Sequence, residues 1–228
     1  MMSEYDIVVE KLKKKADAKY KAFNDRIVVS GYETIGVRIP DIKKIAKEID
    51  KKKIDEYLSE CKFAYYEDVL IYGFLIAGLP FDEFWQKKDF YLSKCDSWGQ
   101  IDCFVPMLKI PKGRQEEFYN LCMNGIETQT DFALRFRIVA LMSFFVGTEQ
   151  HTEEILKTVE KLDGKGYYND MAIAWLISVA FIKKRDITLR FLKKDKLSVF
   201  THNKAISKIN DSYRVDESDK KYLKTLRK

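Results

Sequence analysis

The chain has 228 residues, of which 46% are hydrophobic and 14% aromatic, with only 10 Gly and 4 Pro. This composition excludes a disordered chain, a collagen and a turn-dense β-sandwich, and a chain of this length folds without disulfides or metal. Lys and Arg outnumber Asp and Glu by 41 to 35, and the resulting net charge of +6 permits a polyanionic partner without requiring one.

Apolar residues recur along the whole chain at the spacing of an α-helix, and no segment alternates as a strand does. The pattern predicts helices over residues 4–23, 40–50, 53–60, 65–78, 81–94, 98–109, 113–125, 131–146, 151–162, 168–184, 186–194, 200–211 and 216–227. Pro40 suits the first turn of its helix, and Asp96 or Ser97 is expected to cap the helix that begins near Trp98. The sequence therefore predicts an all-α protein.

The predicted helices alternate in character, which indicates a repeated unit. Those at 65–78, 131–146 and 168–184 are apolar almost all round, whereas 151–162 carries one apolar stripe. The first helices of successive pairs begin at residues 65, 98, 131, 168 and 200, with spacings of 33, 33, 37 and 32 residues. Such a period predicts an α-solenoid of helix pairs. Because no Pro/Ser-rich linker interrupts the chain, we expect one domain over residues 1–228, acting as a monomer.

Membrane, metal and redox roles find little support in the sequence. The longest nearly uncharged runs, Val69–Phe81 and Met171–Ile182, are shorter than the ~20 residues that cross a bilayer, and no signal peptide is evident. Four cysteines form no C-x-x-C pair, and the only histidines are His151 and His202. We therefore expect a cytoplasmic protein with reduced thiols, no metal, no cofactor and no contact with a membrane.

Four residues are candidates for chemistry, and three of them, Asp102, Arg137 and Trp175, lie at similar offsets within the repeat. Trp98 lies one helical turn before Asp102, and the repeat places Arg137 and Trp175 on the equivalent face of later units. Each has a simpler explanation, since a Trp in an apolar helix usually belongs to the core and an Asp near a helix start is usually solvated. Together, a carboxylate, an arginine and two indoles predict a functional groove.

Several segments resemble the AlkD-like DNA alkylation repair family, whose members are HEAT-like α-solenoids. Gly36-Val37-Arg38-Ile39-Pro40 resembles its G-V-x-x-P segment, and Trp98 to Asp102 resembles its Trp-x-x-x-Asp motif. Arg137 falls at the family's helix arginine, and Ala172 to Trp175 resembles its A-I-x-W motif. The C-terminal segment Asn203-Lys204-Ala205-Ile206, followed by Tyr213-Arg214, also resembles the family's sequence. Where active members often carry Trp and Asp on either side of the motif Trp, this chain has Ser97 and Gly99.

The resemblance implies antiparallel HEAT-like helix pairs with a concave groove that holds duplex DNA carrying alkylated purines. It also implies a monofunctional DNA glycosylase, a hydrolase that releases N3- and N7-alkylated purines without turning the base into a pocket. In that interpretation Asp102 positions water and stabilises positive charge on the deoxyribose, while Trp98 and Trp175 lie against the sugar. Arg137 holds a phosphate, and further phosphate contacts are expected from residues close to the motif segments: Arg38, Arg135, Lys204, Lys208 and Arg214.

A second interpretation stays open from the sequence. A non-catalytic HEAT-like scaffold would bind nucleic acid or protein through the same groove, and the modest net charge of +6 and the residues Ser97 and Gly99 favour it. The basic runs, such as those at 11–15 and 51–53, are interleaved with acidic residues, so we interpret most of them as solvated edges. The carboxylate–indole pair one helical turn apart favours the enzyme.

Overall fold

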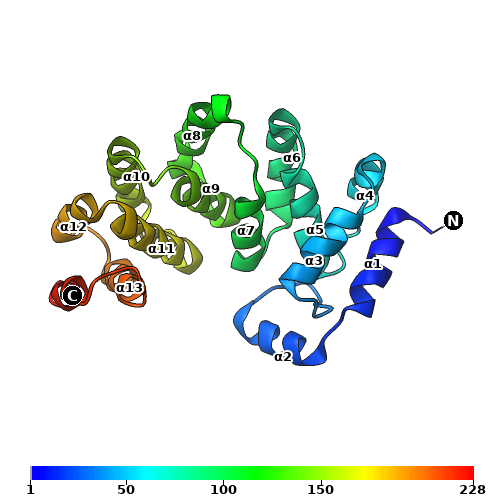
Figure 1. The fold of residues 1–228 in the computed structure, drawn as a ribbon, viewed down its shortest axis with the longest axis horizontal. Helices are drawn as coiled ribbons and strands as arrows, with labels where there is room; N and C mark the ends of the chain where they lie inside the picture. The colour runs from blue at the N-terminus through cyan, green and yellow to red at the C-terminus, as the bar shows by residue number, and fades with distance from the viewer. Residues whose placement is uncertain (1) are drawn as a thin grey trace. The chain divides into compact units, whose positions relative to one another are not determined.

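The computed structural model describes residues 2–228 and consists of helices joined by short connections (Figure 1). Up to Pro111 the α-helices are α1 (Glu4–Lys14), α2 (Ala18–Ile27), α3 (Ile39–Glu48), α4 (Ile54–Glu60), α5 (Tyr66–Ala77), α6 (Phe81–Lys94) and α7 (Trp98–Phe104). From Lys112 they are α8 (Gln115–Met123), α9 (Asp131–Phe144), α10 (Glu149–Leu162), α11 (Tyr167–Lys183), α12 (Arg185–Lys193), α13 (Val199–Asn210) and α14 (Glu217–Lys224). Short 3₁₀ turns occupy Lys51–Lys53, Val105–Met107, Lys112–Arg114 and Ile126–Thr128.

The all-α prediction is confirmed. Within the described residues the β-structure amounts to one isolated parallel bridge between Glu33 and Tyr65. The first helices of the expected pairs begin at Tyr66, Trp98, Asp131, Tyr167 and Val199, each within one residue of its predicted start. No helix in residues 2–228 is both long and apolar enough to span a bilayer.

One predicted helix is wrong. The pattern predicted a continuous helix over residues 4–23, but the structure has two, because α1 ends at Lys14 and α2 starts after Asp17. The Asp17 carboxylate accepts hydrogen bonds from the backbone N–H groups of Lys19 and Tyr20, at 2.9 and 3.0 Å. Since a side chain that caps a helix start satisfies N–H groups with no intrahelical partner, Asp17 begins a new helix.

The chain divides into two compact units, one up to Pro111 and the other from Lys112 onward. In the first unit, α5 packs against α3, α6 and α7, while α1 packs against α3 and α4 (Figure 1). Every residue of α5 is buried, as its apolar sequence predicts. The single domain over residues 1–228 stays a prediction.

The second unit has two layers of helices (Figure 1). Helix α11 packs against both α9 and α13, and these three helices form one layer; α10 and α12 contact each other and cover α11. In α10 the predicted apolar stripe of Ile155, Leu156, Val159 and Leu162 is buried. The alternation of mostly buried and amphipathic helices is therefore confirmed in this unit.

A buried carboxylate organises the loop that precedes α3. Glu67, 2% exposed in the first turn of α5, accepts hydrogen bonds from three successive backbone N–H groups. Its Oε1 accepts from Gly36 at 2.8 Å and from Val37 at 3.1 Å, and its Oε2 accepts from Ile35 at 3.0 Å. Charge-assisted hydrogen bonds of this kind are among the stronger ones in proteins. Glu67 thus holds the G-V-x-x-P segment against the helix that forms the centre of the first unit.

The same loop positions α2. Gly36 has a φ of +93°, and a Cβ there would lie 2.6 Å from the Cβ of Lys21, so the close approach of α2 requires glycine. The Gly36 carbonyl accepts from the Asp17 N–H at 3.0 Å. Arg38 pairs with the Asp17 carboxylate at 2.9 Å, and its guanidinium lies 4.8 Å from the centre of the Tyr20 ring. The loop and the start of α2 therefore form one hydrogen-bonded assembly.

We predict that Glu67→Ala lowers the free energy of unfolding by about 3 kcal/mol or more, because it removes the acceptor of three largely buried N–H groups. Urea unfolding followed by circular dichroism measures the change. Glu33→Ala is the matched control, since Glu33 is an exposed carboxylate near the same loop, and it should change stability by less than about 0.5 kcal/mol. Equal effects of the two substitutions would contradict the structural role of Glu67.

Candidate active site

Helix α7 begins with a capping box that places Trp98 at its first residue. The Ser97 Oγ accepts from the Gly99 N–H at 3.3 Å, and the Gln100 Oε1 accepts from the N–H groups of Ser97 and Asp96 at 3.0 and 2.8 Å. Such reciprocal bonds satisfy the first N–H groups of a helix. Ser97, one of the two caps predicted, is therefore the residue that starts α7.

The indole of Trp98 is tied to the end of α2. Its Nε1 donates to the carbonyl oxygen of Ile27 at 3.3 Å, and the side chain is half-buried. The connection that follows α2 is held beside it, because the Asp96 carboxylate accepts from the Ser30 hydroxyl at 2.8 Å and from the Gly31 N–H at 2.6 Å. Asp96 and Trp98 together anchor the end of α2 to the start of α7.

Asp102 lies one helical turn after Trp98 on α7 and is half-buried. Its neighbour Cys103 has a raised thiol pKa, chiefly because the thiol is buried and also because the Asp102 carboxylate is close. A thiol in this state is not a nucleophile at neutral pH. The chemistry that α7 offers is therefore that of a carboxylate beside an indole.

Gly99 is required by the packing of α7 on α5. A Cβ at this position would lie 2.5 Å from the Tyr66 hydroxyl oxygen, and Tyr66 is 4% exposed. A larger side chain after Trp98 would therefore displace a buried tyrosine. The packing against Tyr66 therefore explains why this position carries glycine.

Two predicted arginines on α9 bond to backbone carbonyls within the second unit. The Arg137 Nη1 donates to the carbonyl oxygens of Leu121 at 3.0 Å, Cys122 at 3.2 Å, and Asn124, at the end of α8. Cations at a helix C-terminus are stabilised by the helix dipole. Arg135 is 5% exposed and donates to the carbonyl oxygen of Tyr168 at the start of α11. Both side chains therefore connect α9 to a neighbouring helix.

The remaining predicted residues of the second unit are more accessible. Trp175 is half-buried on α11, and its indole N–H makes no hydrogen bond within residues 2–228. Lys204 and Lys208 are half-exposed and lie one turn apart on the same face of α13. Arg214 is exposed in the connection after α13. These positions suit contacts with a ligand from outside.

The structure brings together only part of the predicted site within one unit. Trp98 and Asp102 share α7, and both Trp98 and Arg38 contact α2; Arg137 and Trp175 belong to the second unit. The sequence analysis missed Asp96 and Glu67 as positioning residues. Both are carboxylates next to a helix start, and this signal also fits a simple helix cap. It did not reveal their partners, which lie 30 or more residues earlier in the chain.

No group of three or more potential metal ligands occurs in the part of the chain that the structure describes. The four cysteines are free thiols, and burial raises the pKa of Cys61 to about 12 and that of Cys95 further. Thiols with such pKa values are inert at neutral pH.

Comparison with known proteins identifies the family of the chain. The family model of the DNA alkylation repair enzymes matches residues 8–209. The chain therefore belongs to the DNA alkylation repair enzyme family, and a role in DNA alkylation repair follows from this membership. A search of curated proteins finds no match to the chain.

We predict that Arg137→Ala lowers the free energy of unfolding by about 1–2 kcal/mol, because several carbonyls at the end of α8 lose a charged donor. Urea unfolding measures the change. Arg214→Ala removes the same charge from an exposed position and should leave stability within about 0.5 kcal/mol of wild type. A silent Arg137→Ala would show that capping of α8 is not a function of this side chain.

Proposed function

We propose that the protein is a monofunctional DNA glycosylase that hydrolyses the N-glycosidic bond of N3- and N7-alkylated purines in duplex DNA. The observation that carries this proposal is the carboxylate–indole pair on α7. Asp102 lies one turn from Trp98, and the Trp98 indole is held by its hydrogen bond to the Ile27 carbonyl oxygen. A positioned indole and a half-buried carboxylate are suited to a positive charge that develops between them.

The proposed reaction needs these groups and no acid from the protein. Alkylation at N3 or N7 makes the purine a cation, so the bond between C1′ and the base breaks with its electron pair leaving on the neutral alkylated purine. Positive charge then develops on the deoxyribose, where the Asp102 carboxylate stabilises it. Water adds to C1′ and loses a proton, and the products are the free base and an abasic site.

Binding residues complete the proposal. Trp98 and Trp175 would lie against the sugar, since indole faces attract cations by about 0.5–2 kcal/mol depending on desolvation. Arg137, Arg38, Lys204, Lys208 and Arg214 would contact phosphates; Arg135 is the least suited of the predicted set because it is 5% exposed. We also propose one HEAT-like solenoid domain over residues 1–228, acting as a monomer in the cytoplasm, where the thiols stay reduced.

A non-catalytic scaffold is the second candidate. Two observations favour it: Ser97 and Gly99 stand where active relatives often carry Trp and Asp, and Arg137 is engaged by the end of α8. Such a protein would bind nucleic acid or protein through the same residues and release no base. Release of radiolabelled methylpurines from alkylated duplex DNA by the wild-type protein separates the two candidates.

We predict that Asp102→Asn slows release of 7-methylguanine and 3-methyladenine by about 100–1000-fold, because it keeps the shape of the side chain and removes only its charge. Single-turnover base release at saturating protein measures the effect. Folding and DNA affinity should stay close to wild type. Trp98→Ala and Trp175→Ala should cost less, because cation–π contacts are weaker.

Asp55→Asn is the matched control, since Asp55 is an exposed carboxylate in the first turn of α4. It should release bases at the wild-type rate. If wild type releases bases and Asp102→Asn does so equally fast, Asp102 is not the catalytic carboxylate. If wild type releases none, the scaffold replaces the glycosylase.

We predict that affinity for duplex DNA falls by at least about tenfold between 50 and 200 mM salt, because binding to phosphates releases counterions. Arg137→Ala should weaken binding to normal and alkylated duplexes by similar factors, since phosphates carry no information about the base. Fluorescence anisotropy measures both effects. Lys51→Ala, at an exposed position away from the motif segments, is the control. Affinity that is independent of salt would contradict DNA binding through phosphates.

A further inference from the structure

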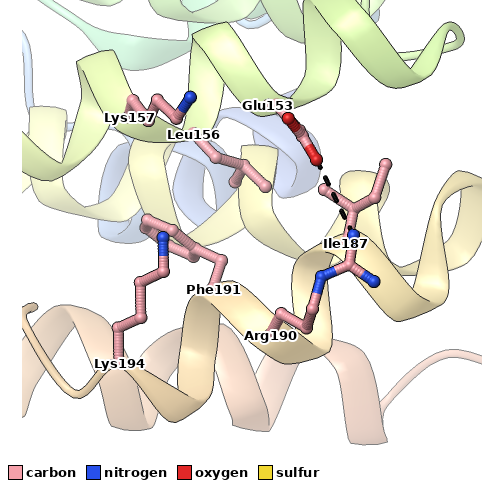
Figure 2. Close-up of a pocket in the computed structure, with 7 residues that line it drawn as sticks. All are labelled: Glu153, Leu156, Lys157, Ile187, Arg190, Phe191 and Lys194. Atoms are coloured by element: carbon pink, nitrogen blue, oxygen red, sulfur yellow. Dashed lines mark ion pairs between the residues drawn. The ribbon is translucent and has the colours of Figure 1, made fainter.

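A hollow of about 230 Å³ lies between α10 and α12 in the second unit (Figure 2). None of the residues of the proposed glycosylase site lines it. Its floor is apolar and consists of Leu156 from α10 with Ile187 and Phe191 from α12. These three side chains are 2%, 9% and 7% exposed, so the hollow opens directly onto the core of the unit. An opening of this kind accommodates a large apolar side chain from another molecule.

Charged side chains from α10, and from α12 and the residues that follow it, form the rim of the hollow and continue beyond it. Glu153 on α10 pairs with Arg190 on α12 at 3.7 Å, and Glu160, further along α10, pairs with Lys196 in the connection after α12 at 3.4 Å. Between these two ion pairs of opposite charges lie two residues of the same charge, Lys157 on α10 and Lys194 just after α12. Figure 2 shows the Glu153–Arg190 pair toward one end of the hollow and the two lysines toward the other.

The two lysines differ from their ion-paired neighbours on α10 and α12 in making no ion pair. Both are exposed, and neither makes an ion pair within residues 2–228. The nearby carboxylate on α10 is that of Glu154, which accepts hydrogen bonds from Tyr119 at 2.8 Å and Gln150 at 3.3 Å. These hydrogen bonds chiefly lower the pKa of Glu154, and the Lys157 charge lowers it further without forming an ion pair. Two like charges that line one hollow repel each other. An anion between them would relieve the repulsion and form ion pairs like those on either side.

We propose that this hollow is a docking site for an acidic segment of a partner protein, in which a carboxylate lies between Lys157 and Lys194 and an adjoining Leu or Phe covers the apolar floor. The charge pattern favours a protein over DNA, because a peptide can alternate acidic and apolar side chains, whereas every nucleotide of a DNA strand would bring a phosphate toward Glu153 and Glu160. The site is open to solvent, so a segment that continues along α10 and α12 gains contacts that a small free acid cannot make. The inference does not depend on base excision.

The test is a titration of the ¹⁵N-labelled full chain with the peptide EDLFEDL, acetylated and amidated at its ends, followed by NMR. We expect saturable shifts at the amides of Lys157, Phe191 and Lys194, with a Kd below about 1 mM. Lys157→Ala combined with Lys194→Ala should weaken binding by about tenfold. Lys161→Ala combined with Lys193→Ala removes the same charge from the same helices outside the hollow, and should change binding by less than about twofold.

Five results would overturn the proposal. The first is the absence of shifts at these amides with millimolar peptide, and the second is equal weakening by the two double variants. The third is equal binding of a peptide in which Ser replaces each Leu and Phe, which would show general attraction of charges. The fourth is displacement through the same lysines by undamaged duplex DNA, which would assign the hollow to nucleic acid. The fifth is equally tight binding of benzoate, which would assign the hollow to small acids. Base release by the wild type is scored separately and decides none of these outcomes.

Discussion

The first unit depends on the hydrogen bonds that the Glu67 carboxylate accepts from three successive backbone N–H groups. A carboxylate buried in an apolar helix is stable only when its oxygens are satisfied, and the loop at Ile35–Val37 satisfies them. That loop bonds to Asp17 at the start of α2, and the end of α2 accepts the indole N–H of Trp98. The position of the indole beside Asp102 is therefore connected, through α2, to a charge buried in α5.

Several residues that match the family's motifs also have structural roles in this chain. Gly36 permits the approach of α2, Gly99 leaves room for the Tyr66 hydroxyl, and Arg137 bonds to the end of α8. A structural duty does not exclude a functional one, since side chains at a site must be held in place by their surroundings. It does mean that loss of activity in a variant is informative only when its stability is measured beside it.

Helix positions were predictable because local patterns encode them. The predicted helix at 81–94 agrees with α6 at both ends, where Phe81 and Phe84 return at helical spacing to one buried face. The break at residues 15–17 was missed because helical spacing continues across it, and the cap at Asp17 is a short signal within a Lys-rich stretch. For the site, the sequence predicted the Trp98–Asp102 pair, since residues four apart share a helix face. It did not predict Asp96 or Glu67 as anchors.

The sequence by itself determined that the chain is helical, which helices are buried, and that its residues resemble a DNA alkylation repair family, because periodicity and short motifs are local properties. Only the tertiary structure decided where Glu67 finds its three donors, which carbonyl accepts from the Trp98 indole, and which lysines line one hollow without an ion pair. These contacts join residues far apart in the chain, as Trp98 and Ile27 show. Burial and hydrogen-bond geometry depend on how the helices pack, which the order of residues along one helix does not specify.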